Sequence, residues 1–135
     1  MLVRDCMSAH PVTVRHDADY KVALKLMQDH ALHHVPVLDN RENLVGIVAE
    51  RDLLLAATHH MQAAVDVGDV MHRSVVTTTG DTPVGEAAAL MVDHRIGGLP
   101  VLDAGRRVVG VITETDIFRA FVASERAAAA IPRAG

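Results

Sequence analysis

The chain contains two copies of one sequence unit. Residues 67–120 repeat residues 3–56 at a constant offset of 64, without an insertion or deletion between them. Because matching residues occupy matching places in two copies of a fold, the repeat predicts a duplicated small domain with approximate twofold symmetry. Two copies of this length are not the stacked array of a solenoid. The matched pairs include Asp5/Asp69, Met7/Met71, Pro36/Pro100, Gly46/Gly110, Glu50/Glu114 and Asp52/Asp116.

The composition indicates an aliphatic core and excludes some classes of partner. Half of the 135 residues are hydrophobic but only 2% are aromatic, and the formal net charge is −4. We therefore expect no affinity for nucleic acid, since neither a basic face nor an aromatic stacking surface is available. The lone Cys6 forms no intrachain disulfide, and no stretch resembles a signal peptide or a membrane span. The expected localisation is cytoplasmic.

Each copy is predicted to read strand, helix, strand, strand, helix. In the first copy the pattern favours a strand at 11–14, a helix over 19–30, strands at 34–38 and 44–49 joined by a hairpin, and a helix from Glu50. In the second copy, Thr82 and Pro83 are expected to be the N-cap and first residue of a helix. The domain boundaries follow: first repeat 1–60, linker 61–66, second repeat 67–123, and a flexible tail over 124–135.

Three segments that occur in order in both copies resemble a tandem pair of cystathionine β-synthase (CBS) domains, also called a Bateman module. They are Val3 to Met7 with Val67 to Met71, the Pro-Val-Leu-Asp strands at 36–39 and 100–103, and Gly46 to Asp52 with Gly110 to Asp116. The resemblance covers residues 3–121. We therefore expect a stand-alone module without an enzyme domain or a membrane channel.

The resemblance implies an α+β fold, in which two βαββα repeats form a pseudo-twofold disc with two three-stranded sheets packed face to face. It also implies two clefts that bind adenine nucleotides or related adenosyl compounds, with ribose contacts from a Gly-x-x-Thr/Ser-x-x-Asp segment. The chemistry suits this use, because a carboxylate accepts hydrogen bonds from both hydroxyls of a ribose diol. The free N–H groups of the adjacent helix start favour a phosphate.

The two copies differ in this segment. The second keeps Gly110, Thr113 and Asp116, whereas the first has Ala49 in place of the hydroxyl and keeps Asp52. A lost polar contact of about 1 kcal/mol would separate the two affinities about fivefold. We therefore take the cleft built on Asp116 (the Asp116 cleft) as the primary site and the one built on Asp52 (the Asp52 cleft) as the secondary site.

The resemblance further implies that each cleft combines residues from both copies. Carried over by position, the Asp116 cleft comprises Val12, Thr13, Leu32, His33, His34, Pro36, Val111, Thr113, Thr115 and Asp116. The Asp52 cleft comprises Ile47, Arg51, Asp52, Val76, Thr77, Ile96, Gly97, Gly98 and Pro100.

A second difference between the copies also falls in this region. His33 and His34 stand where the second copy has Gly97 and Gly98. Imidazoles with an ordinary pKa of about 6.5 bind phosphate better when protonated, so we expect tighter binding at mildly acidic pH. Arg51 and Arg95 are further candidate phosphate contacts.

Simpler interpretations stay open for these residues. In these interpretations Asp52 and Asp116 stabilise the start of a helix and have no further role. His33 and His34 are then ordinary exposed loop residues. With His30 they form His-x-x-His-His, but no further ligand completes a metal site. Gly46 and Gly110 could simply relieve crowding inside a strand.

The sequence therefore predicts a non-catalytic sensor that binds an adenine nucleotide, with AMP preferred over ADP or ATP, and that needs no metal or cofactor. The alternatives are a structural or partner-docking module with empty clefts, or a binder of S-adenosylmethionine or NAD. No arrangement typical of a hydrolase or a phosphate loop supports an enzyme. A homodimer is expected through the second helix of each copy, at Leu53, Leu54, Ile117, Phe118 and Phe121.

Overall fold

The computed structural model describes residues 1–59 and 64–130 of the chain. The first copy consists of α1 (Val3–Cys6), β1 (Ser8–Ala9), β2 (Val14–Arg15), α2 (Tyr20–His30), β3 (His34–Leu38), β4 (Leu44–Ala49) and α3 (Glu50–His59). The second consists of α4 (Val67–Val70), β5 (Thr78–Thr79), α5 (Val84–His94), β6 (Gly98–Leu102), β7 (Val108–Thr113) and α6 (Glu114–Ala130). The mixed α+β class and the duplicated unit are thus as predicted.

A side-chain cap accounts for the start of α2 but not for that of α5. The Asp19 side chain accepts a hydrogen bond from Lys21 N at 2.8 Å and caps α2. In the second copy the prediction was wrong by one residue, because Pro83 is the N-cap and makes no side-chain bond. The Thr82 hydroxyl lies 2.8 Å from the Thr79 hydroxyl instead, so it does not cap α5.

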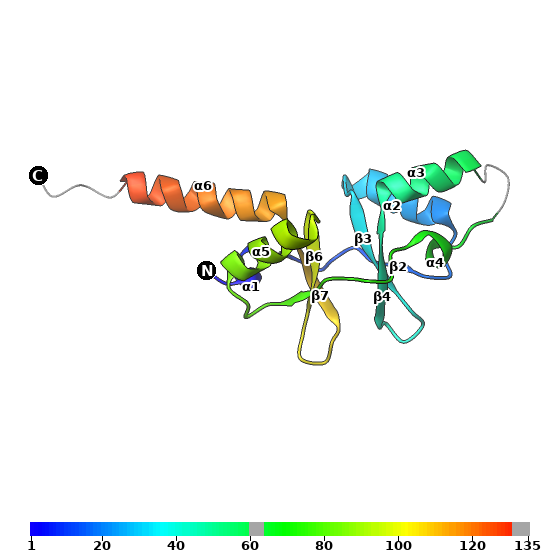
Figure 1. The fold of residues 1–135 in the computed structure, drawn as a ribbon, viewed down its shortest axis with the longest axis horizontal. Coiled ribbons are helices and arrows are strands. Elements are labelled where there is room, and N and C mark those ends of the chain that lie inside the picture. Colours follow the sequence, from blue (N-terminus) through cyan, green and yellow to red (C-terminus); the bar gives the residue numbers. More distant parts are fainter. Residues whose placement is uncertain (60–63, 131–135) are drawn as a thin grey trace, which may run out of the picture.

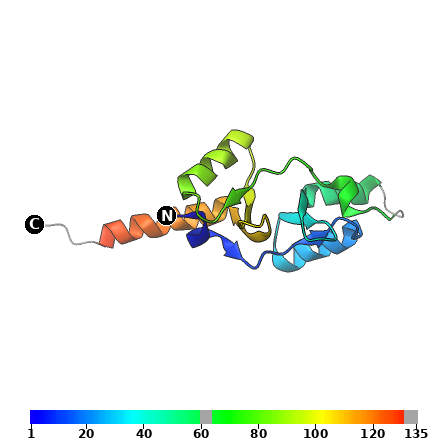
Figure 2. The same ribbon diagram turned by 90° about the horizontal axis from the view of Figure 1, so that it is seen from below.

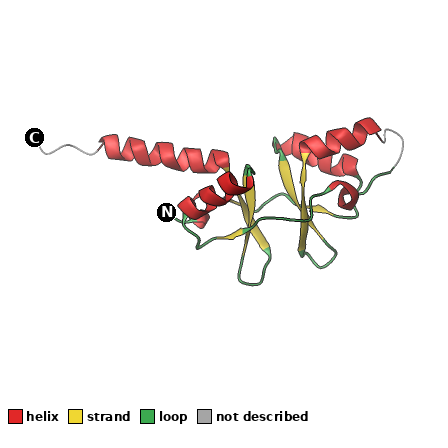
Figure 3. Cartoon of the chain, in the orientation of Figure 1, coloured by secondary structure: helices red, strands yellow, loops and turns green. Residues whose placement is uncertain are grey.

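Two sheets form the centre of the molecule, with the helices on their outer sides (Figure 1, Figure 3). One sheet has the strand order β2-β3-β4 and the other the order β1-β7-β6-β5. The prediction of two three-stranded sheets is therefore wrong for the second sheet. It gains β1, because Ser8 and Ala9 pair with Val111 and Gly110, whereas the corresponding segment of the second copy makes only the single bridge between His72 and Ile47.

The start of each copy crosses over and packs on the other copy. Val3 N donates to Thr82 O at 2.8 Å, and Val67 N donates to Ala18 O at the same distance. Both valines are fully buried, each in the hydrophobic core of the opposite copy. The segments after α1 (residues 7–13, the first crossing segment) and after α4 (residues 71–77, the second crossing segment) then run back between the two halves (Figure 1, Figure 2). This crossing replaces most of the strand predicted at 11–14, which is reduced to Val14–Arg15.

The repeated glycines make room for the crossing. A Cβ atom on Gly110 would lie 2.6 Å from the Met7 sulfur and 2.9 Å from Ser8 O. A Cβ atom on Gly46 would lie 2.5 Å from the Met71 sulfur and 2.8 Å from His72 O. Such distances are well inside van der Waals contact, so close backbone approach explains these glycines.

The ends of the two copies differ from a plain linker and tail. Val65 is buried, and its carbonyl accepts a hydrogen bond from Tyr20 N at 2.8 Å, so the end of the 61–66 segment belongs to the first core. Residues 61–63 lie outside the described residues. In the tail predicted over 124–135, α6 continues as a helix to Ala130. The remaining residues, 131–135, are not among those described.

Thr78 offers a test of this core. Its hydroxyl is buried without a hydrogen-bond partner among the described residues, and Val14 occupies the equivalent place in the first copy. Thr78→Val should raise the free energy of unfolding by about 1 kcal/mol, because it removes an unsatisfied buried group. Urea unfolding measures this change. The matched substitution Val14→Thr should lower stability, and a loss of stability in Thr78→Val would contradict the packing described.

Candidate functional site

The Asp116 cleft is a hollow of about 610 Å³ between the two copies. All residues predicted for it line it except Thr13. Thr13, which directly precedes β2, is not part of the lining. The cleft is also lined by residues that the sequence analysis did not assign to it: Ser8, His10, Pro11, His30, Ala31, Ile47, Gly97, Gly98, Glu114 and Arg119.

Asp116 and Thr113 form a reciprocal cap at the start of α6. Asp116 Oδ2 accepts hydrogen bonds from Thr113 N at 2.9 Å and from Thr113 Oγ1 at 3.0 Å. Asp116 N in turn donates to Thr113 Oγ1 at 3.4 Å. This is the geometry of a capping box. The Thr113 hydroxyl thus holds the carboxylate in place, and within the described chain Asp116 Oδ1 makes no hydrogen bond.

Cationic and titratable groups lie along the same cleft. Arg119, on the next turn of α6 after Thr115, lines it together with His33 and His34. The sequence analysis missed Arg119, although comparison at the offset of 64 contains the signal, since Leu55 occupies its place in the first copy. An arginine side chain is a permanently charged donor that suits a phosphate.

His34 lies where the two clefts approach each other and lines both. Although its ring remains accessible to water, partial burial lowers the pKa of His34, and the neighbouring His33 lowers it further. The carboxylates of Asp52 and Glu114 act in the opposite direction but do not reverse the shift. His34 is therefore mainly neutral at pH 7 in the free protein.

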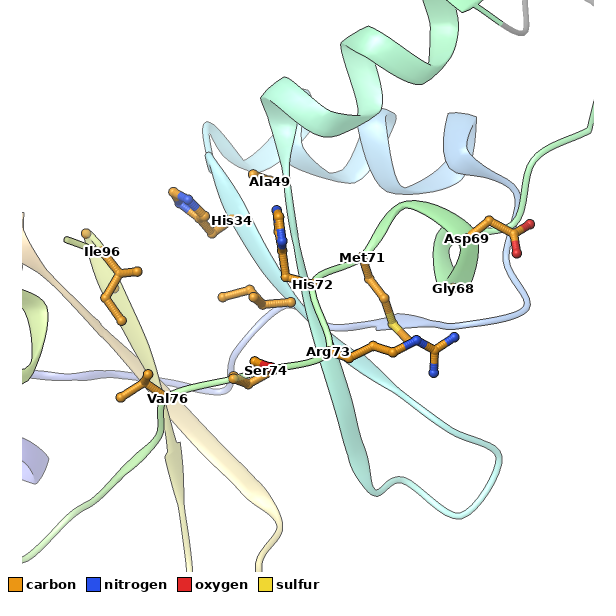
Figure 4. A pocket seen from close by; sticks show the side chains of 14 residues that line it. His34, Ala49, Gly68, Asp69, Met71, His72, Arg73, Ser74, Val76 and Ile96 are labelled. Carbon is orange, nitrogen blue, oxygen red and sulfur yellow. The ribbon is translucent and has the colours of Figure 1, made fainter. Parts of the chain in front are cut away.

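The Asp52 cleft, a hollow of about 770 Å³, is built differently (Figure 4). Of the residues predicted for it, the structure brings together Ile47, Val76, Ile96, Gly97 and Gly98. The other lining residues are His34, Ala49, Gly68, Asp69, Met71, His72, Arg73, Ser74 and Val75.

Four residues predicted for the Asp52 cleft do not line it. Pro100 is fully buried, Thr77 directly precedes β5, and Arg51 faces a separate hollow beside Leu54 on α3. Asp52 itself approaches the cleft only through His72, whose Nε2 lies 2.9 Å from Asp52 Oδ2.

Arg95, the other phosphate candidate, also lies outside both clefts. It ends α5 in the left-handed conformation, with φ of 54°, and faces a hollow beside Val92 and Phe118. The chain turns at this residue, and its side chain borders the outer helices α5 and α6 rather than either cleft.

The described part of the chain offers neither a metal cluster nor a membrane-spanning helix. Over 1–59 and 64–130, no three His, Cys, Asp or Glu side chains come close enough to hold a metal ion. In the same ranges, no helix combines the length and apolarity needed to cross a bilayer.

The duplicated fold agrees with a comparison against protein-family models. The model of the CBS domain matches twice, at residues 3–59 and 67–123. This chain belongs to the CBS domain family. The two matches coincide with the two copies that exchange their N-terminal segments, and the proposed ligand clefts lie between these two CBS domains.

Curated relatives include proteins of different architecture. A CBS domain-containing protein of Dictyostelium discoideum is 36% identical over 128 residues, which cover 87% of this chain and 88% of that protein. The L-aspartate semialdehyde sulfurtransferase of Methanocaldococcus jannaschii is 35% identical over 120 residues, covering 89% of this chain but 23% of the enzyme. The chain thus spans about a quarter of that enzyme's length.

Solved CBS structures show similar folds with adenosyl compounds bound. The CBS domain pair of protein MJ0100, solved with 5′-methylthioadenosine and S-adenosyl-L-methionine, has a TM-score of 0.82 and 35% identity, covering 92% of this chain and 98% of that one. CBSX2, solved with AMP, has a TM-score of 0.82 and 28% identity, with coverage of 93% and 98%.

Proposed function

We propose that this CBS pair is a non-catalytic sensor that binds an adenine nucleotide, with AMP as the preferred ligand, in the Asp116 cleft. The observation that carries the proposal is the capping box that fixes Asp116. Its second carboxylate oxygen is free of hydrogen bonds from the described residues and can accept from a ribose hydroxyl. The cleft volume of about 610 Å³ is also in the range of small-molecule sites.

The choice of a phosphorylated ligand rests on one cationic and two titratable side chains of the lining. Arg119, His33 and His34 can face a phosphate. None of them has a basic counterpart in the other copy, where the matching residues are Leu55, Gly97 and Gly98. Among the structural neighbours, CBSX2 was solved with AMP, whereas MJ0100 was solved with ligands that carry no phosphate. We therefore favour AMP over S-adenosylmethionine and 5′-methylthioadenosine.

Regulation would follow from the composite nature of the cleft. Its walls come from β3 and the first crossing segment of one copy and from β7 and α6 of the other. A ligand held by both copies favours whichever relative packing binds it better. The effect on a partner is limited by that difference in affinity.

Replacing Asp116 tests the proposed ribose contact. Asp116→Asn should weaken AMP binding about tenfold or more, because a hydrogen bond to a charged group contributes about 1.5–3 kcal/mol. Isothermal titration calorimetry measures the loss. The matched variant Asp52→Asn should leave the affinity of the Asp116 cleft nearly unchanged.

Unchanged AMP affinity in Asp116→Asn would contradict the assignment of the cleft.

A thermal-shift panel of AMP, ADP, ATP, NAD, S-adenosylmethionine and 5′-methylthioadenosine distinguishes a sensor from a docking module. A ligand at 100 times its Kd stabilises the folded state by about 2.7 kcal/mol. If no adenosyl compound raises the Tm at millimolar concentration, the docking module is the correct alternative.

Affinity for AMP should depend on pH through His34. The pKa of His34 in the free protein is below its ordinary value, so the imidazole is neutral at pH 8. A bound phosphate favours the protonated ring, and binding then takes up a proton as the pH falls toward 6.5. We expect AMP affinity to rise roughly two- to tenfold from pH 8 to 6.5, measured by calorimetry.

Two controls isolate the histidine. His34→Ala, together with His33→Ala, should flatten the AMP profile. Binding of 5′-methylthioadenosine, which has no phosphate, should vary little with pH in the wild-type protein. A wild-type AMP profile as flat as that of the variants would remove the histidines from the mechanism.

We further propose a homodimer, with a surface that differs from the predicted one. Leu53 is fully buried in the first core and is not available to a partner, whereas Ile117 is half-buried against the second core beside Phe118. Leu54 and both phenylalanines of the chain are exposed, Phe118 to 64% and Phe121 to 63%. Leu55 and Val122 extend the exposed apolar surface on α3 and α6.

A second copy is the partner that we expect on this surface, because large apolar side chains on two helices of a single chain suit a self-complementary interface. Phe121→Glu should shift the protein to the monomer, as measured by sedimentation equilibrium. Lys25→Glu, on an exposed part of α2, is the charge control and should leave the dimer intact. A wild-type protein that is monomeric at high micromolar concentration would contradict the interface.

A further inference from the structure

We propose that His72 closes the Asp52 cleft to ribose diols by occupying the Asp52 carboxylate, and that this side chain sets the ligand stoichiometry of the CBS pair. The inference rests on the proposed function, because it concerns the second copy of the same adenosyl site. Sequence comparison of the two copies did not single out His72: it pointed to the hydroxyl missing at Ala49 and to His33 and His34, which replace Gly97 and Gly98. The structure points to a residue on a different segment.

The backbone fixes the position of His72. His72 N donates to Ile47 O at 2.8 Å, and Ile47 N donates to His72 O at 2.9 Å, so the crossing segment is held against β4. Figure 4 shows the imidazole rising beside β4 toward the strand end, where Ala49 lies. Asp52 follows in the first turn of α3. The histidine is thus anchored beside the carboxylate by contacts that do not involve its side chain.

The contact uses the group that a ribose would need. His72 Nε2 lies 2.9 Å from Asp52 Oδ2, and since an ionised carboxylate only accepts hydrogen bonds, Nε2 is the donor. The Asp52 side chain is 25% exposed and that of His72 is 66% exposed, so the ring lies on the solvent side of the pair. His72 lines the cleft whereas Asp52 does not, so the imidazole lies between the carboxylate and the cleft. A diol that approaches from the cleft must first displace the imidazole.

The other copy shows why Asp116 is not occupied in this way. Ser8 is the residue at the His72 position, and it pairs with Val111 of β7 as His72 pairs with Ile47. In the described chain, Ser8 makes no hydrogen bond to Asp116, which is held instead by the capping box with Thr113. Ala49 cannot form such a box, and no hydrogen bond joins Ala49 N to Asp52. The carboxylate is therefore able to turn to His72.

Two residues thus act together to make the copies different. The missing hydroxyl at Ala49 releases Asp52 from its helix, and His72 then captures it. Loss of the hydroxyl alone predicts an affinity about fivefold lower at the second cleft. Capture by a donor adds the loss of a hydrogen bond to a charged group, for a total difference of about a hundredfold.

The test is AMP titration by calorimetry on the intact chain. Wild type should bind one AMP per chain with measurable affinity. His72→Ser, which places the serine of the first copy in the second, should raise the affinity of a second site about tenfold or more. His72→Ser with Ala49→Thr should bring it close to that of the first. Circular dichroism and urea unfolding establish that the variants are folded.

A third variant identifies the site. His72→Ser with Asp116→Asn should retain binding at the Asp52 cleft, and adding Asp52→Asn should weaken that binding about tenfold or more. The inference is overturned if AMP binds the second site as weakly in His72→Ser and in its Ala49→Thr derivative as in wild type. That result would leave the assignment of the Asp116 cleft intact.

Failure of the proposed function gives a different result. If wild type binds no AMP but His72→Ser binds one AMP that depends on Asp52, the role of His72 is supported and the Asp116 assignment fails. If wild type, His72→Ser and the Ala49→Thr derivative all bind none, both proposals are wrong.

Discussion

The reciprocal exchange of N-terminal segments is the contact on which the rest of the molecule depends. Val3 is buried in the core of the second copy and Val67 in that of the first, so neither core is complete without the other copy. Full burial of a valine contributes about 1.5–3 kcal/mol. The return path of each segment passes over Gly46 or Gly110, where a larger side chain would collide with the chain. The exchange also brings Val12 and Val76 into the clefts between the copies.

The two copies share one fold, and the chemistry of their clefts differs through the contacts that hold the equivalent carboxylates, Asp116 and Asp52. Asp116 is held by its own helix start through Thr113, and it borders a cleft that also contains Arg119. Asp52 is held by His72 from the crossing segment. The same fold therefore presents a carboxylate that lines one cleft, whereas in the other cleft His72 lines the wall and the carboxylate of Asp52 lies behind it. In this account, asymmetry of ligand binding needs no asymmetry of the backbone.

The sequence was sufficient for the parts of the fold that depend on local patterns and on the repeat. The starts of α2 and α3 and both hairpins follow from capping, apolar spacing and turn residues. Thr13 and Pro100 were misplaced because a family pattern carried over by position does not show which residues reach the surface of a cleft: Pro36 lines the Asp116 cleft, whereas its counterpart Pro100 does not line the other one. His72 was missed because its partner Asp52 lies 20 residues away along the chain, and only the crossing segment brings them together. Arg119 was detectable, since the repeat places it opposite Leu55.

A crystal structure of the protein grown with AMP near saturation of its tighter site tests the central claim most directly. The account predicts one AMP per chain in the Asp116 cleft, with a ribose hydroxyl on Asp116 Oδ1, the phosphate near His33, His34 or Arg119, and the bond between His72 and Asp52 intact. An AMP bound first in the Asp52 cleft, with its ribose on Asp52 and the Asp116 cleft empty, would contradict it.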